Sequence, residues 1–241
     1  MRIVYGFDSV APLSHAVATV GSYDGVHRGH RELLAEVVRY ARERGGESVV
    51  ITFEPHPRLV LGNDGVGLLT TLDEKCALLE EVGIDCVVVI PFDRAFAAIS
   101  HEEFINEYIV GRLHVEQLVV GYNHRFGHEN RGDYKFLTQC GGLKVVEVGQ
   151  YRYDGDKVSS TQIRKAIEQG DMAQAQRLLG HPYIIKGIAN EQGRVAVPEH
   201  KLLPSDGKYR ADIEGILTTI EVVGGVILQR ELFSQEIAIK L

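Results

Sequence analysis

The chain is poor in cysteine and methionine and has no tryptophan among its 241 residues. Its three cysteines, Cys76, Cys86 and Cys140, are odd in number and have no Cys-x-x-Cys spacing, which argues against a disulfide framework or a zinc site. Long hydrophobic runs are also missing, because even the longest, such as 86–90, are far too short to span a bilayer. The N-terminus lacks a basic segment followed by an apolar core. We therefore expect no signal peptide, no membrane association and a cytoplasmic location.

An excess of positive charge is absent as well. The net charge is −7 and no block of basic residues occurs, so a general nucleic-acid-binding face is not expected. A local basic pocket for small anions remains compatible with this charge. Hydrophobic residues make up 44% of the chain, enough for a substantial core in one large domain or in a domain with an appendage. Nothing in the composition identifies a protein partner.

Short β-branched runs alternate with amphipathic stretches through most of the chain. This alternation predicts an α/β fold in which a parallel, Rossmann-like sheet carries helices on both faces. Ligands bind such sheets outside the carboxyl ends of the strands. The predicted strands lie at about 1–8, 15–20, 48–53, 86–92, 117–123 and 144–148, and predicted helices lie around 33–41, 71–83, 100–109 and 134–139.

The stretch Gly21–His30 (GSYDGVHRGH) joins a predicted strand to a predicted helix. Free backbone N–H groups and the positive end of the helix dipole attract phosphate at such a crossing, and glycines let the backbone approach a ligand. Two histidines three residues apart would share one side of the first helical turn. A glycine-rich turn or a solvated histidine alone is commonplace, but the combination indicates a site for a phosphate chain. The candidate residues are Gly21, Tyr23, Asp24, Gly25, His27, Gly29 and His30.

This stretch is neither a Walker loop nor a Gly-x-Gly-x-x-Gly fingerprint. It resembles the His-x-Gly-His signature of the nucleotidyltransferase superfamily. The fuller string is similar to the Asn-Phe-Asp-Gly-Val-His-x-Gly-His motif of the FMN adenylyltransferase module of prokaryotic bifunctional flavin-synthesis enzymes. Ser22 and Tyr23 replace the usual Asn and Phe, while both histidines remain in place.

The string Thr52–Pro57 (TFEPHP) follows a predicted strand and is also similar to a segment of the flavin enzymes. Its prolines forbid continuation of the strand. His56 therefore falls at a carboxyl end, where it is a candidate flavin- or nucleotide-binding residue. The alternative is a histidine held in a rigid proline loop.

A polar stretch from Gly121 to Asp133 leaves the predicted strand at 117–123. Taken alone it suits either recognition of a base or flavin phosphate or an ordinary polar loop. The flavin enzymes carry a Gly-x-Asp/Asn-x-x-Phe-Gly stretch here, which this chain resembles. By that resemblance Asn123 contacts nucleotide, and Arg125 is a further candidate.

The string Val158–Arg164 (VSSTQIR) predicts a helix capped by Ser159. Ser160 and Thr161 then lie in the first turn with exposed amides, and Arg164, one turn on, reaches toward an anion bound there. The alternative is a capped helix with a solvated arginine. The string resembles the family's Ile-Ser-Ser-Thr-x-Ile-Arg motif, and the resemblance extends over about 15–185.

After Tyr183 the pattern changes to short strands between turns, which predicts a small β domain. We therefore expect a nucleotidyltransferase domain over 1–182 and a β domain over 183–241. In the bifunctional flavin enzymes a kinase barrel begins here with Gly-Arg-x-x-Gly-x-Pro-Thr-Ala-Asn. In this chain Gly193-Arg194 is followed by Val-Ala-Val-Pro198, without the Thr and Asn that hold metal and ATP. This departure from the family's motif predicts a truncated kinase-like domain without riboflavin kinase activity, kept as a structural or partner-binding remnant.

The resemblance implies transfer of AMP from ATP to FMN, giving FAD and pyrophosphate. His27 and His30 would act on the α/β-phosphates, and Ser160, Thr161 and Arg164 on the β/γ-phosphates. Mg²⁺ would be carried by the triphosphate, so no protein metal ligands are expected. Two alternatives remain: a related transferase with another phosphate acceptor, such as a phosphopantetheine or nicotinate nucleotide, or a non-catalytic flavin- or nucleotide-binding regulatory protein.

Overall fold

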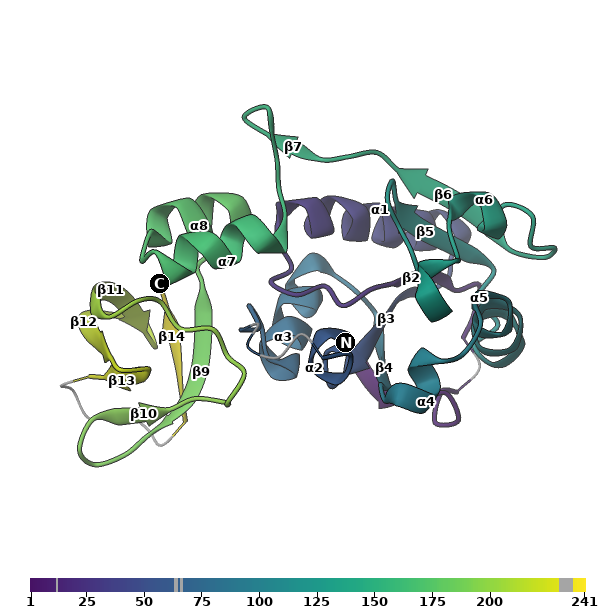
Figure 1. Cartoon of the computed structure of the whole chain (residues 1–241). Helices are drawn as coiled ribbons and strands as arrows, with labels where there is room; N and C mark the ends of the chain where they lie inside the picture. Colours follow the sequence, from purple (N-terminus) through teal and green to yellow (C-terminus); the bar gives the residue numbers. More distant parts are fainter. Residues whose placement is uncertain (12, 63–64, 66, 230–235) are drawn as a thin grey trace. The chain divides into compact units, whose positions relative to one another are not determined.

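In the computed structural model, which describes residues 1–11, 13–62, 65, 67–229 and 236–241, the chain forms two compact units (Figure 1). Each unit is assembled from stretches that are separate in the sequence. The domain boundary expected at 182/183 stays a prediction. The first unit comprises Met1–Tyr23, Gly29–Asp64 and Cys76–Tyr151, and the second comprises Asp24–Arg28, Gly65–Lys75 and Arg152–Leu241.

The first unit is built on a six-stranded sheet in the order β1-β4-β3-β2-β5-β6. Every neighbouring pair is parallel; Val17 of β2, for example, lies opposite Ser48 of β3 and Gln117 of β5. The predicted parallel sheet is therefore confirmed. The strands are β1 (Arg2–Tyr5), β2 (Val17–Val20), β3 (Ser48–Glu54), β4 (Cys86–Pro91), β5 (Gln117–Gly121) and β6 (Lys144–Val148).

The strand order reverses at β2. From β2 the chain continues to β3 on one side, and it later returns to β5 on the other side. In an open α/β sheet this reversal leaves a crevice outside the carboxyl ends of the two strands, because their connections run to opposite faces. The segments that follow β2 and β5 are two of those in which the sequence predicts ligand-binding residues.

Helices cover both faces of the sheet, as predicted. On one face Val37 and Ala41 of α1 pack against Val17 and Val119, and on the other Ile109 of η1 belongs to the larger core cluster. Alternate side chains of each strand thus enter different layers, which is why the strands read as continuous apolar runs. The helices are α1 (Arg28–Arg44), α2 (Pro57–Val60), α3 (Leu72–Val82), α4 (Arg94–Ala97), α5 (His101–Glu103), η1 (Phe104–Arg112), η2 (His128–Asn130) and α6 (Tyr134–Leu137).

The helix predicted around 100–109 is present, with an unpredicted change of winding. Ser100 caps it as expected, since its Oγ accepts the Glu103 N–H at 3.0 Å. From Phe104 the helix is of the π type, and the Leu113 N–H donates to the Tyr108 carbonyl, five residues back, at 3.1 Å. Neither the capping residues nor the spacing of apolar residues predicts this wider turn, which arises in the packed helix.

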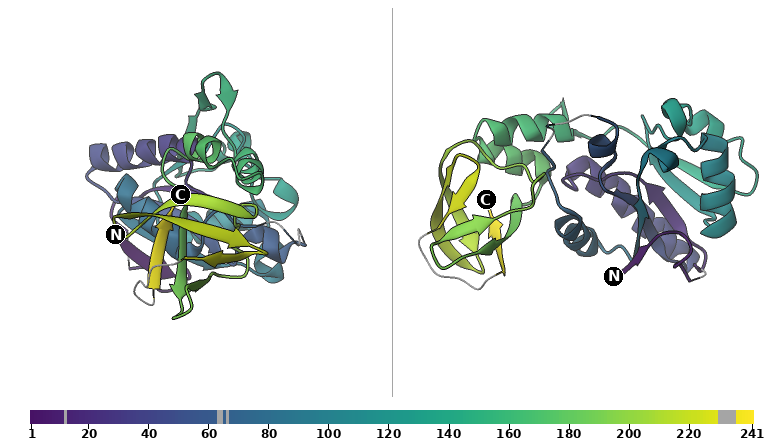
Figure 2. Two further views of the ribbon diagram at one scale, coloured as in Figure 1. Left: turned by 90° about the vertical axis from the view of Figure 1, so that its left-hand side faces the viewer. Right: turned by 60° about the horizontal axis from the view of Figure 1, so that its bottom comes forward.

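The second unit contains a closed antiparallel barrel in the order β10-β13-β12-β11-β14-β9, visible in both panels of Figure 2. Alternate side chains point inward, and Ile185, Ile213, Ile220 and Ile239 are fully buried. The predicted small β domain is confirmed. The strands are β9 (Ile184–Ala189), β10 (Arg194–Ala196), β11 (Gly207–Ile213), β12 (Ile216–Val223), β13 (Val226–Leu228) and β14 (Glu236–Lys240).

Two helices and a hairpin also belong to the second unit. Helix α7 (Ser160–Glu168) is capped by Ser159, whose Oγ accepts the Gln162 N–H at 3.4 Å, as the sequence predicts. Helix α8 (Met172–Leu179) ends at Gly180, whose φ of 82° is left-handed. The hairpin of β7 (Arg152–Tyr153) and β8 (Asp156–Lys157) has no counterpart among the predicted elements. None of the helices in the described ranges has the length and apolar composition that crossing a membrane requires.

Candidate active site

The turn after β2 begins in the first unit with Tyr23. Its hydroxyl lies 2.5 Å from Thr19 Oγ1 inside the core, and burial raises its pKa above the ordinary value. Its ring packs edge-on against the imidazole of His30, with 5.2 Å between centroids. His30 is the third residue of α1, so the helix and the Tyr23 ring together restrict its orientation. Gly29, beside it, is half-buried in the first turn of the same helix.

The second unit holds a buried ion pair between Asp24 and Arg164, whose side chains are only 4% and 7% exposed. The Arg164 Nε also donates to the Gly67 carbonyl at 2.8 Å. Asp24 Oδ1 accepts the Thr70 N–H at 3.0 Å and the Thr70 hydroxyl at 3.3 Å. Because each carboxylate oxygen has a partner, Asp24 fixes the guanidinium in one orientation.

His27 is buried in the same unit and immediately precedes α1. Burial lowers its pKa from 6.5 to about 4, since the charged imidazolium is disfavoured away from water; the nearby Asp24 opposes this shift and Arg164 adds to it. His27 is therefore neutral at neutral pH. A neutral imidazole donates one hydrogen bond and accepts another, so it serves a phosphate as a donor rather than as a cation.

Helix α7 presents its N-terminus in this unit. Ser160 donates its hydroxyl hydrogen to the Asp24 carbonyl at 3.1 Å, and Thr161 is exposed. Gly25 follows Asp24 with a φ of +86°, and a Cβ there would lie 2.7 Å from the Leu69 side chain, so only glycine fits. The second unit thus brings together Asp24, Gly25, His27, Ser160 and Arg164, all candidates from the sequence.

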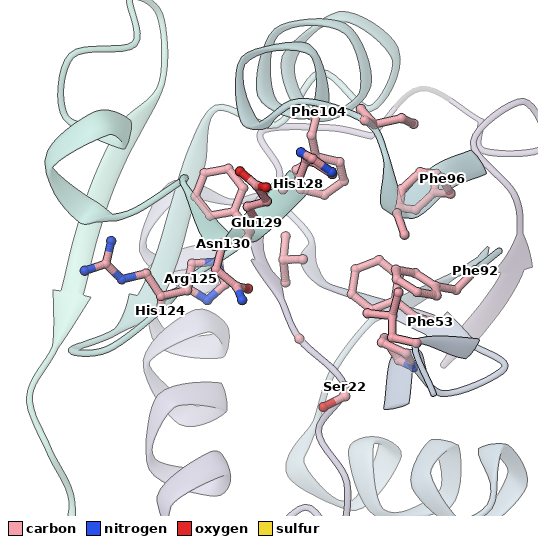
Figure 3. Close-up of a pocket in the computed structure, with 18 residues that line it drawn as sticks. Ser22, Phe53, Phe92, Phe96, Phe104, His124, Arg125, His128, Glu129 and Asn130 are labelled. Carbon is pink, nitrogen blue, oxygen red and sulfur yellow. The ribbon is translucent and has the colours of Figure 1, made fainter. Parts of the chain in front are cut away.

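A pocket of about 570 Å³ opens in the first unit. It is lined by Val20 and Gly21 at the carboxyl end of β2 and by 124–130 after β5. In Figure 3 the rings of Phe53, Phe92 and Phe96 gather on one side, and His124 and Asn130 lie on the opposite side. The pocket therefore occupies the crevice that the strand order predicts.

The polar side of this pocket contains two fixed groups. Burial lowers the pKa of His124 from 6.5 to about 4, so this imidazole is also neutral, and it stacks on Phe126 with 5.4 Å between centroids. Arg125 lines the pocket, but its guanidinium pairs with Asp133 at 3.0 Å and points away from the pocket centre in Figure 3. The pocket therefore has an apolar, aromatic interior with few polar groups, which is typical of small-molecule sites.

The remaining candidates lie at or near this crevice. His56 is buried beside the pocket-lining Pro57, and its Nδ1 accepts the Arg58 N–H at 3.1 Å, which caps α2. This contact supports the alternative of a histidine held in the proline loop. Asn123 is exposed in the turn after β5 and does not line the pocket, whereas its neighbour His124 does.

Sequence reasoning did not assign the pocket aromatics to a site. Phe104 is a core residue, only 5% exposed, and it also lines the pocket. Phe53 and Phe92 stand at the ends of β3 and β4, so their position at predicted carboxyl ends was the available signal. Phe96 comes from α4, a four-residue helix that the sequence pattern does not reveal.

Comparison with known proteins gives a consistent result. The family model described as FAD synthetase matches residues 10–162. The bifunctional riboflavin kinase/FMN adenylyltransferase of Escherichia coli K12 is 33% identical over 267 aligned positions, covering all of this chain and 85% of the relative. The Bacillus subtilis protein of the same name is 33% identical, covering 88% of this chain and 70% of the relative.

A solved structure shares the fold across nearly the whole chain. The crystal structure described as a macrolide-efflux protein from Streptococcus pneumoniae superposes with a TM-score of 0.85 and covers 99% of this chain and 88% of its own. The two sequences are 22% identical, so the likeness concerns the fold alone. It supports the pairing of an α/β sheet and a β-barrel in one chain.

Proposed function

Because the chain belongs to the FAD synthetase family and is a nucleotidyltransferase, we propose that it transfers AMP from ATP to FMN, giving FAD and pyrophosphate. The observation that carries this proposal is the aromatic pocket at the carboxyl ends of β2 and β5. Its volume of about 570 Å³ lies within the range of small-molecule sites. A planar, tricyclic flavin ring suits an interior lined by Phe53, Phe92 and Phe96, since aromatic faces and edges pack well against it.

The pocket also bears on the choice between acceptors. A phosphopantetheine is a flexible aliphatic chain, and a nicotinate nucleotide offers one small ring. Neither would cover the several aromatic side chains that line the cavity, whereas an isoalloxazine would. Burial of that much aromatic surface favours FMN as the acceptor among the three.

The proposed reaction needs no base and no covalent enzyme intermediate. A phosphate oxygen of FMN, already anionic, attacks the α-phosphorus of ATP, and the bond from that phosphorus to the pyrophosphate oxygen breaks. The protein contributes alignment of the two phosphates and stabilisation of the charge that develops on them. We assign His27 and His30 to the α/β-phosphates, where neutral His27 acts as a hydrogen-bond donor.

The leaving pyrophosphate is assigned to α7. Ser160 and Thr161 present the amides of the first turn, and the dipole of this nine-residue helix favours an anion there. Arg164 supplies the permanent positive charge, held in orientation by Asp24. Among the described residues, no group of three or more His, Cys, Asp or Glu side chains is arranged to hold a metal ion. We propose that Mg²⁺ enters with ATP, bound mainly to its phosphates, where it neutralises charge.

We further propose that the barrel lacks riboflavin kinase activity, although the relatives are named as bifunctional. Gly193 precedes β10, which begins at Arg194, and the chain continues as Val-Ala-Val-Pro198 without the motif's Thr and Asn. Those two residue types supply the oxygens that such a site needs for metal and ATP. Incubation with riboflavin and Mg-ATP tests this proposal: riboflavin should remain unchanged, and appearance of FMN would overturn it.

The cysteines agree with a reducing location. Cys76 and Cys86 are buried and Cys140 is half-buried, and all three are free thiols. Proteins of oxidising compartments commonly pair their cysteines, so we propose the cytoplasm as the location of this enzyme.

Acceptor profiling tests the proposed function. ATP labelled at its α-phosphate is offered with FMN, riboflavin, phosphopantetheine or nicotinate mononucleotide in separate reactions. We expect label in FAD with FMN and none in any product of the other acceptors. Label in another dinucleotide would reassign the acceptor, and absence of transfer to all four would favour a non-catalytic binding protein.

A further inference from the structure

A segment far from His27 and His30 in the sequence connects the barrel to Arg164. We call it the strap, defined as Gly67–Glu74; all of it lies within the second unit. On one side the strap holds the phosphate-site candidates. Its Gly67 carbonyl accepts the Arg164 Nε, and its Thr70 binds Asp24 through both the backbone N–H and the hydroxyl. Thr70 Oγ1 also accepts the Gly25 N–H at 3.0 Å, so the strap supports the turn as well as the ion pair.

On its other side the strap is fixed by Lys201, from the loop between β10 and β11. The ammonium donates to the Leu69 carbonyl at 2.6 Å, to the Ile184 carbonyl at 2.6 Å and to Glu74 Oε2 at 2.7 Å. An ammonium has three hydrogens to donate, so all of its donors are used. The backbone adds two bonds, because the Leu68 N–H donates to the His200 carbonyl at 2.7 Å and the Leu202 N–H to the Leu68 carbonyl at 2.9 Å.

Glu74 completes this attachment. Its Oε1 accepts the N–H of Lys186 in β9 at 2.7 Å, and its Oε2 accepts the Thr71 N–H at 2.9 Å. The side chains of Glu74 and Lys201 are both 0% exposed. A buried ion pair loses much of its attraction to desolvation, so it adds little stability over a well-packed apolar pair. What it does provide is a fixed geometry, because every donor and acceptor must stay satisfied.

We propose that Lys201 is a positioning residue for adenylyl transfer: it holds the strap, and through Thr70, Asp24 and Gly67 it sets the orientation of the Arg164 guanidinium. This inference rests on the proposed role of Arg164 at the β/γ-phosphates. It gives the barrel a part in the transferase reaction that is independent of any kinase activity. The barrel therefore has a physical reason to be present even without kinase activity.

The test is a double-mutant cycle between the strap attachment and Arg164. The paired variant Lys201→Met/Glu74→Gln removes both buried charges while keeping similar volumes, and Lys208→Met, at an exposed position on β11, is the matched control. Misplacement of a catalytic group by about 1 Å costs up to roughly 100-fold, so we expect kcat/KM for ATP to fall about 10- to 100-fold in the paired variant. The control should match the wild type.

The decisive arm repeats the paired substitution in an Arg164→Ala background. If Lys201 acts through Arg164, the further loss there should vanish, because the guanidinium being positioned is gone. The same fold-loss in both backgrounds, or no loss with Arg164 present, would overturn the proposal. Thr70→Val provides a second cycle, with the same expectation, if the paired variant does not fold.

The same set of variants is also compared for Mg-ATP binding, which calorimetry measures without any acceptor present. Failure of the wild type to form FAD would contradict the proposed function, while the calorimetric cycle would still decide the role of Lys201. We expect weaker Mg-ATP binding in the paired variant and no additional weakening once Arg164 is removed. Equal weakening in both backgrounds would show a general structural role only.

Discussion

Asp24 and Arg164, 140 positions apart in the sequence, form an ion pair that is almost fully buried. The pair joins the turn after β2 to the first turns of α7, two motifs that the sequence connects only through family resemblance. A buried guanidinium with one partner removed would retain its charge, because arginine does not lose its proton in proteins. The pair therefore makes the orientation of Arg164 depend on a carboxylate that is not itself expected to carry out chemistry.

Substitution of Asp24 should destabilise the protein. Asp24→Asn keeps the shape but leaves the Arg164 charge buried without its counter-ion, and breaking a buried pair in this way costs about 3–5 kcal/mol. Urea unfolding measures the change, with Asp156→Asn on the exposed hairpin as the matched control. An unfolding free energy equal to that of the control would show that Asp24 does not stabilise Arg164.

Substitution of His30 should reduce turnover without unfolding the protein. Loss of one preorganised donor to a developing charge typically costs about 100- to 1000-fold in kcat. We expect His30→Ala to show a loss of that size with an unchanged circular dichroism spectrum, because the side chain is half-buried at the start of α1. His200→Ala, an exposed histidine, is the control. Turnover near the wild-type value would remove His30 from the site.

Stability should decrease toward acid pH because two histidines, His27 and His124, have lowered pKa values in the folded protein. The pKa of His27 is lowered from 6.5 to about 4, so the unfolded chain binds the proton more readily than the folded protein. Stability from this group is complete above pH 6.5 and is lost as the pH falls from 6.5 toward 4. His124 shifts in the same direction and adds to the effect.

Urea unfolding across this pH range checks the prediction. We expect His27→Gln to lose less stability on acidification than the wild type, and His27→Gln/His124→Gln to lose less again. Parallel curves for the three proteins would mean that neither imidazole is kept neutral by the fold.

Truncation of a pocket aromatic should weaken flavin binding specifically. Phe96 lies on the aromatic side of the pocket, and loss of its contact with a buried ring is worth about 1.5–3 kcal/mol, or roughly a 10- to 100-fold rise in Kd. Titration of FMN fluorescence with Phe96→Ala measures the change. Tyr122→Ala, an exposed aromatic beside the pocket segment, is the control. Equal FMN affinity in Phe96→Ala and wild type would place the flavin elsewhere.

The parts of the fold with local signals were predictable from the sequence. The strands are short apolar runs, and the caps are single side chains such as Thr71, whose Oγ1 accepts the Glu74 N–H while Glu74 accepts its N–H in return. The parallel sheet follows from alternation of elements. Each of these features depends on residues close together in the chain, which is why pattern and propensity were sufficient.

The features that depend on distant contacts were not predictable. Lys201 reads as one surface lysine in a polar loop, and only the fold shows three acceptors around its ammonium. The aromatic pocket collects residues from several separate segments between Val20 and Asn130, so no spacing rule connects them. Physical chemistry alone indicated a phosphate site at Gly21–His30, and the resemblance was needed to assign FMN as the acceptor. The neutral state of His27 follows from burial that the sequence does not reveal.

The most direct measurement of the central claim is the stoichiometry of products formed from FMN and Mg-ATP by the full chain. Chromatography quantifies FAD, and a coupled assay quantifies pyrophosphate. We predict that the two appear in equal amounts and that their rates of formation fall together, by about 100- to 1000-fold, in Arg164→Ala and in His30→Ala. Consumption of ATP without FAD, or no turnover by the wild-type chain, would contradict the account.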